Sequence, residues 1–301
     1  MKKILLTFLA VAVSAVAGEF KPGQVPANAQ WFLHVDVSGF KKTQLGKFGL
    51  EQTKAFAPFI DGFAEMIQFD PRKDLYGITV FGTVTEGEGE VQAKGAVMVH
   101  GNFNQPHLLS LLSTNETFKK EQAKGFEIFS WSDKEKQSYG AFSGRNHLLV
   151  GDNRGLLIEA LQVLRGEAPA LKAAEVGNLA KGNFFLLSSR TKGLPFPAEA
   201  KVLEHVRGIG VTVGEFDKNL VVSARVTAAD DEVITLIQKS VEGLLAVARL
   251  LVWEAEDANL QELEALLREV AIVKQKNTVV IRLAVPVKKI LDLARERLAD
   301  N

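Results

Sequence analysis

Two strands joined by an acidic, glycine-rich turn are predicted between Leu75 and Gly101, in the segment LYGITVFGTVTEGEGEVQAKGAVMVHG. The second strand alternates an apolar series with a more polar one: Val91, Ala93, Val97 and Val99 against Gln92, Lys94, Met98 and His100. A period of two with one apolar face is typical of a half-buried antiparallel strand. We therefore expect an antiparallel hairpin here, with His100 on its outward side.

The same pattern returns in residues 206–227, VRGIGVTVGEFDKNLVVSARVT, with a tighter turn at residues 217–219. Each half of the chain also shows the same order of predicted elements: strand, helix, hairpin, helix, strands, helix. This order predicts an α+β fold built by tandem duplication of a β-α-β-β-α-β-α unit, with units at residues 18–170 and 171–301. We expect mainly antiparallel sheet, continuous or in two parts, with the helices on one face. Two unrelated α+β domains are the alternative.

The remaining elements follow from periodicity and turn residues. In the first half we expect strands at 31–37, 126–131, 138–143 and 147–151, and helices at 105–112 and 154–164. A phenylalanine-rich helical segment at 41–68 is expected to be divided at Pro58. In the second half we expect strands at 183–190 and 279–285, and helices at 198–205, 231–253, 260–270 and 288–298.

The first residues, MKKILLTFLAVAVSAVA, have the pattern of a secretory signal peptide. Two lysines precede an apolar run, and Ala15-Val16-Ala17 is a small-residue cleavage pattern, so we expect cleavage after Ala17. An uncleaved anchor is the alternative, but the run is short for a transmembrane helix. The mature chain would have 301 − 17 = 284 residues, with 36 − 2 = 34 basic against 36 acidic ones. The sequence therefore predicts a periplasmic or secreted protein without a transmembrane segment.

Composition argues against several classes of function. A near-neutral charge gives no electrostatic footprint for nucleic acid or for an anionic membrane surface. The chain has no cysteine, which excludes a disulfide framework, a thiolate nucleophile and a zinc–sulfur site. A hydrophobic core must therefore supply the stability of the exported protein, which is feasible at this length.

The opening VPANAQWFLHVDVSGF and the hairpin entry DPRKDLYGITVFG carry a family resemblance. The sequence resembles uncharacterised exported proteins of planctomycete- and verrucomicrobia-type bacteria, over about its first half. The resemblance implies export and supplies no catalytic residue.

One histidine–carboxylate pair has a spacing that could support chemistry. His34 and Asp36 are two apart on one predicted strand, so their side chains point the same way and could hold a metal or form a base–orienter pair for a hydrolase. A single pair lacks the further ligands that a metal site needs, so we expect two ordinary residues on the less buried face. The other histidines (His100, His107, His147 and His205) show no metal-site spacing. We predict no catalytic residue, no metal and no cofactor.

Two glycine-rich stretches and an acidic turn have structural interpretations. Glu86, Glu88 and Glu90 fit a solvated turn better than a calcium loop. The glycines between Gly208 and Gly214 precede a second strand and not a helix, so we expect close packing or bulges instead of a phosphate loop. Residues 151–155 join a strand to a helix, where capping by Asp152 or Asn153 is favoured over anion binding.

The helix at 231–253 is the most informative feature for function. A stripe runs through it at helical spacing (Val233, Ile237, Val241, Leu244, Ala248 and Leu251), and further apolar residues widen the band. Such a width predicts burial on more than one side. The hypotheses are a non-catalytic cell-envelope protein that binds an unknown partner or itself through this helix, or a carrier of an apolar or amphiphilic ligand between sheet and helix. A hydrolase is a third.

Overall fold

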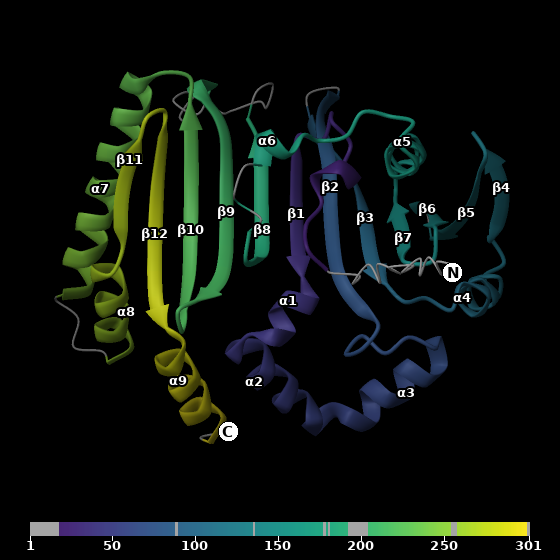
Figure 1. Ribbon diagram of the computed structural model, residues 1–301, viewed down its shortest axis with the longest axis horizontal. Helices are drawn as coiled ribbons and strands as arrows, with labels where there is room; N and C mark the ends of the chain where they lie inside the picture. Colours follow the sequence, from purple (N-terminus) through teal and green to yellow (C-terminus); the bar gives the residue numbers. More distant parts are fainter. Residues whose placement is uncertain are drawn as a thin grey trace, which may run out of the picture.

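One antiparallel sheet organises the molecule (Figure 1). The computed structural model describes residues 18–87, 90–134, 136–176, 179, 181–191, 204–253 and 258–299. Its 12-stranded sheet has the order β11-β12-β10-β9-β8-β1-β2-β3-β7-β6-β5-β4, and each neighbouring pair is antiparallel. The α+β class with an antiparallel sheet is therefore confirmed.

The strands of the first half of the chain form one end of the sheet: β1 (Trp31–Asp36), β2 (Leu75–Gly87), β3 (Glu90–Gly101), β4 (Lys119–Ala123), β5 (Phe126–Asp133), β6 (Lys136–Ser143) and β7 (His147–Gly151). Those of the second half form the other end: β8 (Asn183–Arg190), β9 (Val206–Phe216), β10 (Asn219–Ala228), β11 (Ala271–Gln275) and β12 (Thr278–Pro286). The two ends meet where β1 pairs with β8, from Trp31 opposite Ser189 to Val35 opposite Phe185.

The helices are α1 (Val37–Lys42), α2 (Gln44–Gln52), α3 (Ala57–Ile67), α4 (Gln105–Leu112), α5 (Arg154–Arg165), α6 (Ala173–Val176), α7 (Asp231–Trp253), α8 (Ala258–Arg268) and α9 (Val287–Ala299), with 3-10 turns η1 (Pro22–Gln24) and η2 (Thr53–Phe56). The helical segment at 41–68 is divided as predicted, with Pro58 in the first turn of α3. Helices α1, α2, α3 and α9 lie beyond one end of the strands (Figure 1).

The edge strands β4 and β11 were not predicted. Their sequences, KKEQA and AIVKQ, are short and carry lysine. Charged, short strands are common at sheet edges because they discourage pairing with another chain. Such strands lack a long alternation of apolar and polar residues, so the sequence pattern does not identify them.

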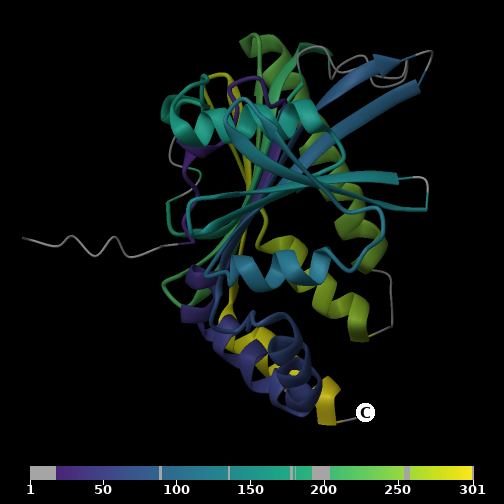
Figure 2. The same cartoon turned by 90° about the vertical axis from the view of Figure 1, so that its right-hand side faces the viewer.

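The helices do not share one face of the sheet, which corrects the prediction. The main core packs α5 and residues near η1 against one face, which includes Phe32 of β1. Cross-strand partners point to the same face, and the register continues Phe32 through Ser188, Gly210, Arg225 and Val280. Helix α7 packs against the adjacent Val279, which points to the other face. We call the side of Phe32 the first face and the side of Val279 the second face; Figure 2 shows the sheet edge-on with α5 and α7 on either side.

The buried side of the first-half strands is also the opposite of the one predicted. His34 is only 1% exposed and His100 6% exposed, and both lie in the core of the first face with Phe32 and Met98. In the predicted inner series, Val97 and Val99 are only half-buried and Ala93 is exposed. The reason is that α5 and the segment after residue 18 cover the histidine side of the sheet.

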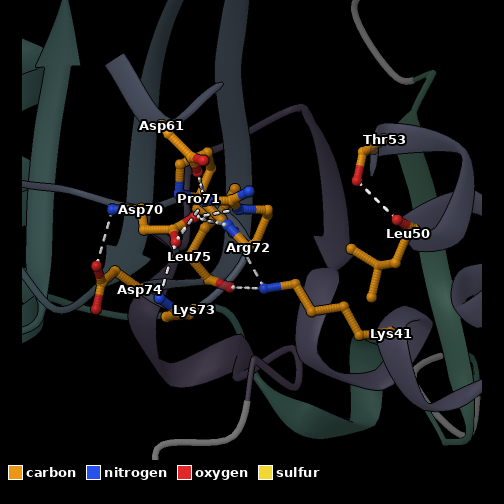
Figure 3. A network of polar contacts seen from close by, with 10 residues as sticks. All are labelled: Lys41, Leu50, Thr53, Asp61, Asp70, Pro71, Arg72, Lys73, Asp74 and Leu75. Atoms are coloured by element: carbon orange, nitrogen blue, oxygen red, sulfur yellow. Dashed lines mark hydrogen bonds and ion pairs between the residues drawn. The ribbon is translucent and has the colours of Figure 1, made fainter. Parts of the chain in front are cut away.

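A polar cluster attaches α3 to the turn before β2 (Figure 3). Arg72 forms ion pairs with Asp70, at 2.9 Å between Nε and Oδ1, and with Asp61 of α3. The hydrogen bond from Arg72 holds the pKa of the Asp70 carboxyl well below its usual range. Lys41 of α1 donates to the carbonyl oxygen of Leu75 at 2.9 Å, so the cluster fixes three segments to one another.

Some predicted segments lie outside the described residues. These are the signal peptide at 1–17, most of the helix predicted at 198–205, and Glu88 in the hairpin turn. Among the helices that the structure describes, none is long and apolar enough to cross a membrane.

Candidate functional site

The C-terminal half of α7 presents an apolar surface to solvent. From Gly243 to the end of the helix, the exposed positions are Gly243, Leu244, Ala246, Val247, Leu250, Leu251 and Trp253. We call this set the α7 outer face. Leu251 and Trp253 are each 72% exposed, and Leu244 is 71% exposed. Large apolar side chains at this exposure, adjacent on one helix, are typical of a binding surface.

The predicted stripe is therefore wrong at Leu244 and Leu251, and the band is not buried on more than one side. Val233 and Ile237 do pack on the second face of the sheet, next to the buried Ile234. Further along, the inward positions include Val252, whereas Leu244 and Leu251 point to solvent. Because almost every residue after position 243 is apolar, the sequence pattern could not distinguish the inward side from the outward one.

No charged side chain interrupts the α7 outer face within the part of the helix from 243 to 253. Arg249 is the charged residue of this stretch, and its guanidinium turns toward α8. Its Nε and Nη2 donate to the carbonyl oxygen of Leu267 at 3.0 and 2.7 Å. This arrangement satisfies a carbonyl at the C-terminal end of α8 and removes the cation from the exposed side.

A second exposed apolar surface lies on α3. No residue of α3 is buried, and Phe59 is 79% exposed, although its phenylalanine spacing resembles a core stripe. Asp61 and Glu65 are exposed on the same helix, and Asp61 is held in the ion pair with Arg72. The α3 surface is thus broken by charge, unlike the α7 outer face.

The predicted pair His34 and Asp36 is not brought together as a chemical site. The Asp36 carboxylate accepts a 2.7 Å hydrogen bond from the Gly39 amide and caps α1. His34 instead lies in a row with the buried Thr79 and His100 and the half-buried His147, contributed by β1, β2, β3 and β7. Sequence spacing could not identify this row because its members come from four strands.

The hydrogen bonds of the row define its protonation. His34 Nε2–H donates to the carbonyl oxygen of Gly18 at 2.7 Å, so in the neutral ring Nδ1 accepts from the Thr79 hydroxyl at 2.9 Å. The Thr79 oxygen then accepts from His100 Nε2–H at 3.1 Å. His147 Nε2 accepts from the Gln24 side-chain amide at 3.2 Å. The bonds are consistent with neutral imidazoles throughout.

Burial favours the neutral form of all three rings. It lowers the pKa of His34 and of His147, and with the added effect of the neighbouring His147 and His34 it lowers the pKa of His100 to about 3. Within the described residues, no group of three or more histidine, aspartate or glutamate side chains is arranged to hold a metal ion. The row therefore has the features of a core hydrogen-bond network.

The other predicted positions have structural roles where they are described. Asn153 accepts from the Leu156 amide at 2.9 Å and caps α5, as expected. His107 Nε2–H donates to the carbonyl oxygen of Met66, which ties α4 to α3. The glycines between Gly208 and Gly214 lie within β9, and a Cβ on Gly214 would come within 2.5 Å of the Phe216 ring, so the close-packing interpretation is confirmed there.

No protein-family model and no curated protein matches this chain. Among solved structures, it is similar to crystal forms I and IV of the Treponema protein TP0453, each with a TM-score of 0.44. Form I shows 9% identity, covering 92% of this chain and 97% of that chain; form IV shows 10% identity, covering 92% and 96%.

Proposed function

We propose that this is an exported, non-catalytic interaction protein of the cell envelope, which associates with a second copy of itself through the α7 outer face. The observation that carries the proposal is the run of exposed, uncharged apolar side chains from Leu244 to Trp253. Burying such a surface is favourable by about 25 cal/mol per Å² of apolar area.

A second copy is the occupant that this surface fits best. A two-fold interface brings the same patch together twice, so it must be free of repulsion with itself. An uncharged face meets that condition, and the near-neutral mature chain adds little repulsion between copies. An anionic membrane surface would instead favour lysine and arginine beside the apolar side chains, and Arg249 turns away from it.

Export enters the proposal through the N-terminal segment. We take residues 1–17 as a cleaved signal peptide that directs the protein to the periplasm or outside the cell. Gly18, the first residue after the predicted cut, already contributes its carbonyl oxygen to His34, and Phe20 lies in the core. The proposal includes a tandem duplication. It is supported by the strand order, because β1, β2 and β3 follow one another from the middle of the sheet toward one edge, and β8, β9 and β10 follow one another from the middle toward the other edge.

The association is tested by sedimentation velocity of residues 18–301 over a concentration series. We expect a species of twice the monomer mass that dissociates on dilution. A strictly monomeric protein at all concentrations would overturn the proposal. A monomer that co-sediments with phosphatidylcholine or phosphatidylglycerol vesicles would also overturn it, since lipid would then be the occupant of the α7 outer face.

A further inference from the structure

A pocket lies on the first face of the sheet, away from α7. Its floor is the cross-strand row Phe32, Ser188, Gly210 and Arg225, and Leu171, Val176 and Leu179 cover it. Its volume is about 760 Å³, within the range of small-molecule sites. The lining therefore joins β1, β8, β9 and β10 to the chain around α6.

Three arginines line this pocket against a single glutamate. Arg190 is engaged: Nη2 donates to the Ala27 carbonyl oxygen at 2.9 Å, and Nη1 is 3.5 Å from a carboxylate oxygen of Glu175. Arg207 is exposed at the rim. The described lining thus has two more positive charges than negative ones, which favours an anion.

Arg225 supplies the most specific sign of a missing partner. Its Nε is shielded from solvent and has no hydrogen-bond acceptor among the described residues. Buried polar atoms almost always have a partner, and an unpartnered one is destabilising, so such an atom in a pocket wall indicates a ligand position. A guanidinium presents adjacent N–H groups that match a carboxylate or phosphate in a bidentate manner.

The rest of the lining is apolar or small. Leu171, Val176 and Leu179 are apolar residues opposite the sheet, and Phe32 is the apolar residue of the floor. Gly208 and Gly210 have no side chain to fill the pocket at their positions, and a Cβ on Gly210 would come within 3.4 Å of the Leu179 side chain. A ligand with a charged head and a short apolar tail could meet both parts of this lining.

We infer that this pocket binds an amphiphilic anion, whose carboxylate or phosphate head pairs with Arg225 and Arg207 and whose alkyl part packs against Phe32 and the α6 segment. The site is independent of the α7 outer face and of the proposed self-association. The pocket also lies on the opposite side of the sheet from α7. A ligand carried between the sheet and the long helix would instead lie on the α7 side.

Isothermal titration calorimetry of the mature protein with decanoate, decyl phosphate and decan-1-ol tests the inference. We expect decanoate or decyl phosphate to bind, with the stronger of the two identifying the head group, and decan-1-ol to bind at least about tenfold more weakly because it lacks the charge. Equal affinity for the alcohol, or binding of none of the three, would overturn the inference.

Variants locate the site. Arg225→Gln is expected to weaken binding of the anion by about tenfold or more, and the exposed Arg207→Gln by a smaller factor without affecting folding. Arg282→Gln is the matched control, because Arg282 is exposed on the same face but does not line the pocket. Unchanged affinity in both lining variants, or an equal loss in Arg282→Gln, would contradict the assignment.

Discussion

Acidification from about pH 7 to about pH 4 is expected to lower the free energy of unfolding by roughly 3 kcal/mol through His100 alone. The folded-state pKa of His100 is lowered from 6.5 to about 3, mainly by burial. Between these two pH values, His100 binds a proton in the unfolded chain but not in the folded chain. The free energy of unfolding is therefore highest above about pH 6.5 and decreases as the pH falls toward the folded-state pKa. The lowered pKa values of His34 and His147 act in the same direction.

Urea unfolding followed by circular dichroism at pH 7, 5.5 and 4 measures this loss. His100→Gln retains a hydrogen-bond donor toward Thr79 but cannot be charged, so we expect lower stability at pH 7 and a clearly flatter pH dependence. His205→Gln is the control, because His205 is exposed and should leave the dependence unchanged. Parallel pH curves for wild type and His100→Gln would contradict the assignment of the acid sensitivity to the histidine row.

A lysine in the α7 outer face is expected to separate the two copies. We predict that Leu251→Lys raises the dissociation constant of the dimer by about 100-fold, since placing a charge on a large apolar side chain that an interface buries commonly costs about 2–3 kcal/mol. The folded monomer should tolerate the change, because Leu251 is 72% exposed and lies outside the core. Analytical ultracentrifugation gives the constant, and thermal unfolding checks the fold.

Leu236→Lys is the matched control on the same helix. Leu236 is exposed as well, but it precedes the uncharged stretch and is three residues, just under one helical turn, from the exposed Lys239. Its substitution should change the dissociation constant by less than about threefold. Equal weakening by both substitutions would show that the interface is not confined to the C-terminal half of α7.

The bounds of the longer helices and strands are what the sequence predicts best. The bounds of α4, β8 and α7 agree with the predicted ones, because each has clear periodicity and a turn or cap at its ends. The short edge strands β4 and β11 were missed because their five residues carry lysines and no sustained alternation.

The sequence does not predict which side of each strand faces the core. Alternation separates two faces of a strand but does not say which one another element will cover. The residues that cover β1 and β3 are Phe20 and Val25, which precede β1, and the side chains of α5, which follows β7 in the chain. His34 and His100 are therefore buried, although their polarity suggested the outer side.

The two candidate surfaces differ in how much the sequence could say about them. The apolar width of α7 identified the helix, but its continuous apolar C-terminal half concealed which side is exposed. The pocket was not predicted at all, because Arg190, Arg207 and Arg225 belong to three strands. The closely spaced glycines of β9 were visible in the sequence, and only the register shows that two of them form the pocket floor.

Disulfide cross-linking through α7 tests the central claim most directly, since the chain contains no cysteine of its own. Val247→Cys places a thiol in the middle of the α7 outer face, where a two-fold axis would bring it next to its equivalent. Leu236→Cys places one 11 residues earlier, about 16 Å along the helix, and therefore roughly 30 Å or more from its equivalent in an antiparallel pair. We predict rapid formation of a covalent dimer by Val247→Cys under mild oxidation and little by Leu236→Cys; equal rates, or a monomer in both cases, would contradict association through this face.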